Sequence, residues 1–131
     1  MTTLTSDHKT HRVVATVPPQ VRWAAFHSAA RGAICSSSLL ADYHWIIDDQ
    51  GPMDDVNLDE MVRSGEVFRS HASRSPKQLA TVVVTTDRSF DLWARVIDEH
   101  YGGRKHYAAP SLAAAHRLLD RLDADHRSER V

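Results

Sequence analysis

The sequence predicts an α/β domain with a mainly parallel sheet of four or five strands, an edge hairpin, and helices packed on the sheet. Continuous apolar and β-branched runs, typical of buried strands, alternate with segments whose apolar residues recur at helical spacing. Strands joined by single helices run parallel through right-handed crossovers. The expected strands are 13–17, 21–26, 45–47, 79–86 and 105–109, and the expected helices are 57–72, 89–101 and 111–122.

Length and composition fit one globular domain. The chain has 131 residues, 42% of them hydrophobic and 25% charged, with a formal charge of -1. This balance disfavours nucleic acid as a partner. The start has no apolar core of a signal peptide, no stretch is long enough to span a membrane, and Cys35 is the single cysteine, so we expect a cytoplasmic protein. We expect a flexible arm at 1–11, the domain at 12–122 and a polar tail at 123–131.

The first expected elements form an edge hairpin. The β-branched run at 13–17 stops at Pro18-Pro19 and resumes with Trp23 and Phe26 within 21–26, which indicates two paired strands. Such a hairpin leaves an edge strand, and its valines, Val13, Val17 and Val21, suggest a surface for homodimer formation. Residues 28–44 are ambiguous, with a short helix expected at 37–43.

The clearest helix start follows the strand at 45–47 and its acidic turn. Asn57 can cap the helix, Glu60 stands three residues later as in a capping box, and Gly65 lies on the apolar face as a point of close packing. The helix at 89–101 is indicated by apolar residues at i, i+3, i+4, i+7 and i+11 and ends at Gly102-Gly103. The last helix begins at Pro110-Ser111.

Three segments carry a resemblance to a known family: HWIIDDQGPMDDVNLDEMVRSGEVF, QLATVVVTTDRSFDLWARVIDEHYGG and RKHYAAPSLAAAHRLL. In element order, in the strand, acidic turn and helix near 45–60, and in the final strand and Ser-Leu-Ala-Ala helix, the chain resembles the STAS-like domains related to anti-sigma-factor antagonists. The resemblance implies a STAS-like sandwich and a non-catalytic regulatory module that binds a protein partner. In the phosphorylated antagonists a Ser or Thr begins the helix after the acidic turn. The matching stretch, 54–58, has no hydroxyl.

Polar residues follow the expected parallel strands at their carboxyl ends, where open α/β sheets bind ligands. We expect a partner or ligand site on the loops 48–57, 86–89 and 110–111. Its acids would favour a basic partner surface, and its arginine could hold an anionic group. The alternative is that these residues only cap helices and turn the chain. The candidate residues are Asp48, Asp49, Asp54, Asp55, Asn57, Thr86, Asp87, Arg88 and Ser111.

Other functions stay open beside the interaction module. A small-molecule or lipid-binding domain is the first alternative, and a receiver-like or metal-binding domain is the second and less favoured. The nine histidines are scattered over different elements, so we expect them at the surface and at helix ends and predict no metal site. No phosphate-binding glycine motif or nucleophile elbow occurs, so neither a cofactor nor a catalytic residue is predicted.

Overall fold

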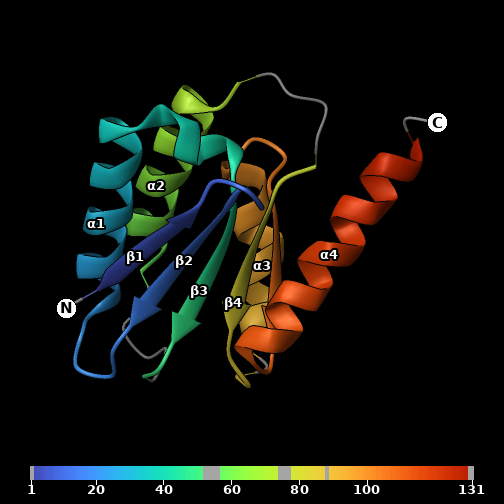
Figure 1. Ribbon diagram of the computed structural model, residues 1–131. Helices are drawn as coiled ribbons and strands as arrows, with labels where there is room; N and C mark the ends of the chain where they lie inside the picture. The colour runs from blue at the N-terminus through green and yellow to red at the C-terminus, as the bar shows by residue number, and fades with distance from the viewer. Residues whose placement is uncertain (1, 52–56, 74–77, 88, 130–131) are drawn as a thin grey trace.

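The computed structural model describes residues 2–51, 57–73, 78–87 and 89–129, with side chains up to residue 125. It confirms the α/β class: a five-stranded mixed sheet is packed between helices (Figure 1). The strands are β1 (Thr3–Asp7), β2 (Arg12–Val17), β3 (His44–Asp49), β4 (Ala80–Val84) and β5 (Lys105–Ala109). The helices are α1 (Trp23–Ser36), the short 3-10 helix η1 (Ser38–Asp42), α2 (Leu58–His71), α3 (Phe90–His100) and α4 (Leu112–Glu129).

The strands lie side by side in the order of the sequence. β1 pairs with β2 in antiparallel register, and each later strand pairs in parallel with the one before it. Helices α1, α2 and α3 form one layer because α2 contacts both of the others, whereas α4 packs on β3, β4 and β5. In Figure 1, α4 lies apart from α1 and α2 across the sheet. The sheet therefore has two covered faces.

Alternation along each strand separates two hydrophobic clusters. On β3, the side chains of Trp45 and Ile47 join the larger cluster under α1–α3, and Ile46 joins the smaller cluster under α4. This is the period-two arrangement of a strand that is buried on both sides. The larger cluster contains most of the aromatic side chains, and it surrounds the cavity that is described below.

The expected flexible arm contains strand β1. Its residues are mostly exposed, so the apolar alternation that marks a strand is missing, and Leu4 alone packs against the larger cluster. The connecting turn closes where Asp7 Oδ1 accepts hydrogen bonds from the backbone N–H of Lys9 at 2.9 Å and of Thr10 at 3.3 Å. The edge hairpin is therefore formed by β1 and β2, and the arm is ordered from Thr3 onward.

The expected strand at 21–26 is wrong, because helix α1 begins at Trp23. Trp23, Phe26, His27 and Ala30 recur at helical spacing and are all buried. As a result β2 is an interior strand, paired with β1 on one side and β3 on the other. Val13 and Val17 of this strand are at most 1% exposed and offer no edge for a second copy.

The chain does not become a solvated tail at residue 123, because α4 continues to Glu129. Asp123 accepts hydrogen bonds from the guanidinium of Arg12 at 3.3 Å and from the ring of His44 at 2.9 Å. Both partners are buried first residues of strands, so they hold this part of α4 against the sheet. Among the described residues, no helix combines the length and the apolar character that crossing a membrane requires.

Candidate functional site

Three residues of the predicted site, Asp48, Thr86 and Ser111, lie at one edge of the sheet. The register aligns Asp48 of β3 with Val84 of β4, and Val84 with Ala109 of β5. Thr86 and Ser111 each follow two residues after an aligned position. The strand ends therefore carry these side chains to the same edge, as the sequence predicts for parallel strands. Asp54, Asp55 and Arg88 lie outside the described residues.

The contacts within this predicted site are local. Asn57 Oδ1 accepts the N–H of Glu60 at 3.2 Å, which caps α2 as predicted, and Ser111 Oγ accepts the N–H of Ala114 at 3.1 Å at the start of α4. Asp87 accepts the N–H and the hydroxyl of Ser89, and these bonds lower the pKa of its carboxyl. The bonds of these three residues are those of helix and turn formation, which fits the alternative that they cap helices.

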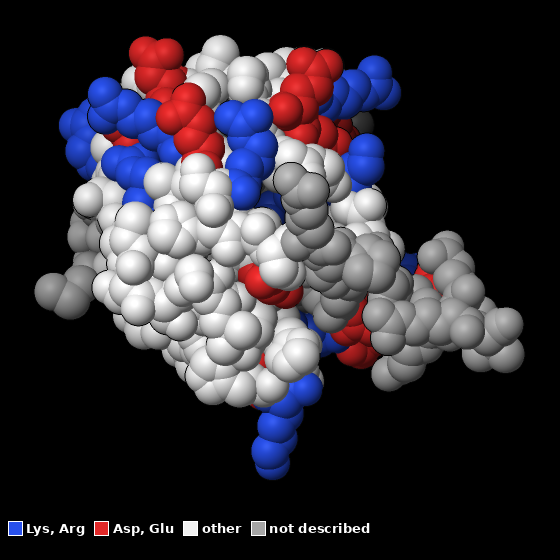
Figure 2. Space-filling view, turned by 90° about the horizontal axis from the view of Figure 1, so that it is seen from above, with Lys and Arg blue, Asp and Glu red and all other residues white. Residues whose placement is uncertain are grey.

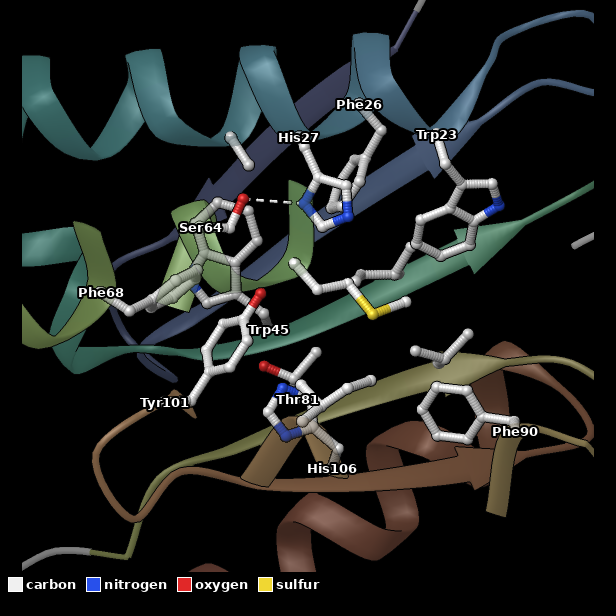
Figure 3. Close-up of a pocket in the computed structure, with 15 residues that line it drawn as sticks. Trp23, Phe26, His27, Trp45, Ser64, Phe68, Thr81, Phe90, Tyr101 and His106 are labelled. Atoms are coloured by element: carbon white, nitrogen blue, oxygen red, sulfur yellow. Dashed lines mark hydrogen bonds between the residues drawn. The ribbon is translucent and has the colours of Figure 1, made fainter. Parts of the chain in front are cut away.

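A cavity of about 40 Å³ lies elsewhere, between the sheet and the layer of α1, α2 and α3 (Figure 3). Its wall is mostly apolar and aromatic, with polar groups supplied by α1, α2, β4, β5 and the end of α3. No described residue of the predicted site lines it. The lining residues are Trp23, Phe26, His27, Ala30, Trp45, Ile47, Met61, Ser64, Phe68, Thr81, Val83, Phe90, Ile97, Tyr101 and His106.

A chain of hydrogen bonds leads from the cavity wall toward solvent. His27 Nδ1 lies 2.8 Å from Ser64 Oγ, which also receives a bond from Arg31 at 3.3 Å. Arg31 pairs at 2.8 Å with Glu60, and this bond holds the pKa of the carboxyl below its usual range. Helices α1 and α2 are therefore joined by a polar contact at the cavity and by an ion pair outside it.

The opposite nitrogen of His27 has no hydrogen-bond partner among the described residues. Nε2 is shut off from solvent, and the whole residue is 4% exposed. In Figure 3 the ring extends from α1 toward the sheet, with Nδ1 facing Ser64 and the other nitrogen on the side of Trp23. Burial lowers the pKa of His27 to about 4, so the ring is neutral at pH 7. A buried polar atom without a partner is rare in folded proteins.

The second cavity histidine has a defined partner on α3. Asp98 Oδ1 lies 2.9 Å from His106 Nδ1 and also accepts the backbone N–H of His106 at 2.9 Å. Burial lowers the pKa of the ring despite the nearby carboxylate. A neutral ring must carry its proton on Nδ1 to bond this carboxylate, so His106 Nε2 is an acceptor.

Tyr101 adds a hydroxyl to the same space. Its side chain points toward the region between Ser64 and Thr81 in Figure 3. Burial raises the pKa of Tyr101 well above its usual value, so the phenol is a hydrogen-bond donor across the physiological range. The cavity thus has an apolar body and a small number of neutral polar groups.

Ser64 and His27 are within hydrogen-bond distance, but the pair does not have the arrangement of a nucleophile and its base. A catalytic histidine is oriented by an acid on its second nitrogen, whereas Nε2 of His27 has no partner among the described residues. The arginine on Ser64 also occupies a lone pair of the hydroxyl. The pair therefore lacks the geometry of a serine nucleophile and its base.

Charges of both signs are mixed on the face of the molecule that Figure 2 shows. In the view of Figure 2, Lys and Arg side chains alternate with Asp and Glu along one rim, and the neighbouring surface is uncharged. Within the part of the chain that the structure describes, no group of three His, Cys, Asp or Glu side chains is placed to hold a metal ion.

The sequence contains a signal for this cavity that the strand interpretation of 21–26 obscures. Trp23, Phe26, His27, Ala30 and Ile34 stand at i, i+3, i+4, i+7 and i+11, the same spacing that correctly predicts α3. That pattern places a histidine on the buried face of a helix. The expectation of surface and helix-end histidines is therefore wrong for His27, His44 and His106, which are all buried.

Comparison of the chain with protein-family models, with curated proteins and with solved structures finds no match.

Proposed function

We propose that this protein is a non-catalytic binding module that takes a small, mainly apolar molecule into the cavity between the sheet and α1–α3. The observation that carries the proposal is the unpartnered Nε2 of His27 in the wall of that cavity. Ligand pockets are typically apolar with a few polar groups that fix orientation, and the composition of this wall has that character.

The size of the cavity restricts the ligand. A water needs about 10–15 Å³ of such space and benzene occupies an apolar cavity of about 150 Å³, whereas this cavity measures about 40 Å³. A ligand larger than a few heavy atoms must displace a lining side chain. Met61 suits this role because its side chain is unbranched and adaptable, and it lies in the wall.

A cavity-filling substitution tests the proposal. Ala30 lines the cavity from α1, so Ala30→Leu places extra atoms where a ligand would bind, and Ala24→Leu makes the same change on the exposed face of the same helix. We expect fragment-sized ring compounds to give saturable NMR shifts of the Met61 methyl in the parent and in Ala24→Leu, and none in Ala30→Leu. Equal titrations in all three proteins would place binding outside the cavity and contradict the proposal.

A protein-interaction role, which the STAS-like resemblance implies, is a second proposal. What favours it is the gathering of Asp48, Thr86 and Ser111 at one sheet edge, with the last two exposed. Replacing Thr86 and Asp87 together by Ala should weaken capture of an isolated partner without lowering the melting temperature by more than a few degrees, since exposed polar groups contribute little to stability. Unchanged capture would exclude this edge.

Self-association is proposed on a different edge from the predicted one. β1 is the first strand of the sheet and pairs with β2 alone, so its outer backbone groups are available to a second copy. Light scattering at several concentrations tests this, and a monomer at high concentration would exclude it.

A further inference from the structure

The hydrogen-bonding character of the cavity follows from how Ser64 shares its proton. Ser64 lies on α2 and is 1% exposed, so its hydroxyl depends on protein partners. A serine hydroxyl donates one hydrogen bond and accepts up to two. Arg31 only donates, and its Nη1 lies 3.3 Å from Ser64 Oγ, so this contact uses a lone pair of the serine.

His27 is then the acceptor for the serine proton. Nδ1 of His27 lies 2.8 Å from Ser64 Oγ, and the hydroxyl of Tyr101 also bonds to Ser64. The phenol can donate to the second lone pair of Ser64, which leaves His27 Nδ1 as the acceptor for the serine proton. A hydroxyl that accepts a bond from a guanidinium is polarised, which makes it a better donor and a poorer acceptor for a second N–H. Both effects favour the arrangement in which Ser64 donates and His27 Nδ1 accepts.

The second ring nitrogen must then carry the proton. A neutral imidazole has one N–H and one lone pair, so a lone pair on Nδ1 leaves N–H at Nε2. The ring stays neutral because burial, and then the nearby Arg31 charge, disfavour protonation. His27 therefore holds an N–H donor at the cavity wall that has no acceptor among the described residues.

We propose that the cavity selects ligands that carry a hydrogen-bond acceptor, such as a ketone or ester carbonyl, and that His27 Nε2–H donates to it. This inference rests on the proposed binding function and adds the class of ligand to it. Nε2 is enclosed by its neighbours, so the carbonyl reaches it when the lining shifts, as a displacement of Met61 would allow.

The assigned proton is measurable without a ligand. Long-range ¹H–¹⁵N NMR of histidine-labelled protein at pH 7 should show His27 with a protonated Nε2 and an unprotonated Nδ1. His106 should show the opposite tautomer, because Nδ1 must donate to Asp98, and it serves as an internal reference. A proton on Nδ1 of His27 would overturn the inference.

Three five-membered rings of similar size then test the ligand class. Cyclopentanone offers an acceptor, methylenecyclopentane has the same shape without one, and pyrrole offers an N–H donor. We expect cyclopentanone to bind about five-fold more tightly than methylenecyclopentane, as the net value of one hydrogen bond implies, and pyrrole to show no preference over methylenecyclopentane. Equal affinities of the first two rings, or a preference for pyrrole, would overturn the inference and leave the binding function intact.

Matched variants assign the preference to His27. His27→Phe keeps an aromatic ring but removes the donor, so it should lower the five-fold ratio to about one, as expected when one hydrogen bond is lost. His71→Phe makes the same change near the end of α2, outside the cavity, and should retain the ratio. If none of the rings gives a saturable shift in the parent, the binding function itself fails. If His27→Phe does not fold, the inference is still tested by the His27 tautomer and by the affinity ratio of cyclopentanone to methylenecyclopentane, both measured in the parent.

Discussion

The carboxylate of Asp123, in the second half of α4, accepts a hydrogen bond from Nε2 of His44 at 2.9 Å. His44 is fully buried, and its Nδ1 accepts the backbone N–H of Ala80 at 3.1 Å, so the ring proton must be on Nε2. One imidazole thus joins β3, β4 and α4. The same carboxylate also receives the buried Arg12.

Removing this carboxylate should destabilise the fold. Asp123→Ala leaves a buried imidazole N–H without its acceptor and weakens the pairing of Arg12, which should lower the free energy of unfolding by about 3 kcal/mol. Asp120 is the control: it also pairs with Arg12, at 2.7 Å, but its side chain is 67% exposed, so Asp120→Ala should cost less than about 1 kcal/mol. Urea unfolding of both variants measures the difference. Equal losses would show that Asp123 has no special role.

The sequence predicts best those elements whose buried faces produce a recognisable local pattern of apolar residues. The continuous run in β4 and the helical spacing in α3 each identify their element because one or two faces are apolar. β1 is polar because it is an exposed edge, so its pairing depends on β2 and not on its own residues. The start of α1 is mistaken for a strand because Val21 and Trp23 follow a β-branched run and two prolines.

The candidate site is harder to predict because its residues are distant in sequence. His27 and Ser64 are on different helices, and their contact exists only because α1 packs on α2. No spacing within either segment specifies this contact. The loops at the strand ends can be predicted, since parallel register alone brings them to one edge. A buried histidine at helical spacing with aromatic residues is the local signal that points to the cavity.

Two helical glycines should respond in opposite ways to the same substitution. A Cβ on Gly65 of α2 would clash with the backbone carbonyl oxygen of His100, so Gly65→Ala must push α2 away from α3 and should cost about 1–3 kcal/mol. This is the close packing that the sequence predicts at Gly65. A Cβ on Gly32 of α1 would meet nothing within 4 Å, so Gly32→Ala should stabilise the protein by about 0.5–1 kcal/mol.

Thermal unfolding of the two variants checks this contrast. If both substitutions stabilise the protein, α2 and α3 are not in close contact at this point. If both destabilise it, Gly32 has a role beyond helix formation.

Arg104 should be among the most sensitive positions in the sheet region. The residue is 4% exposed, and burial lowers the pKa of its guanidinium to about 9, so it remains charged at pH 7. The guanidinium donates to neutral acceptors, and its Cζ lies over the ring of Phe68, 4.5 Å from the ring centroid. The acceptors are the backbone oxygens of Ala41, Tyr43 and Ala80 and the hydroxyl of Thr81, at 2.8–3.3 Å.

Loss of these bonds sets the expected effect. Arg104→Met leaves several buried carbonyl groups without a hydrogen-bond donor and should lower the free energy of unfolding by about 3 kcal/mol or more. Arg104→Lys keeps a charge but not the planar fork, so its loss should be smaller. Arg95→Met, on the exposed face of α3, should change stability by less than about 0.5 kcal/mol. Chemical denaturation ranks the stabilities of the three variants. An Arg104→Met variant as stable as the parent would refute the assigned role.

The last prediction concerns pH. In the unfolded chain His27 has an ordinary pKa of 6.5, whereas in the fold burial lowers it to about 4. The unfolded chain therefore binds a proton that the folded protein excludes, so the free energy of unfolding must fall as pH falls from about 6.5 toward 4. His106 contributes in the same direction because burial lowers its pKa too. Between pH 7 and 4.5, His27 alone should account for a loss of about 2–3 kcal/mol.

His27→Phe separates this contribution from the other titrating groups. Phe cannot titrate, so the variant should lose less stability than the parent between pH 7 and 4.5, whatever its stability at pH 7. His71→Phe is the control, because the side chain of His71 is only half-buried at the end of α2 and is not part of the cavity wall. Urea unfolding at both pH values gives the three differences that are needed, one for each protein. If His27→Phe follows the parent through this range, the ring of His27 is not held neutral by burial, and the donor assigned to the cavity loses its basis.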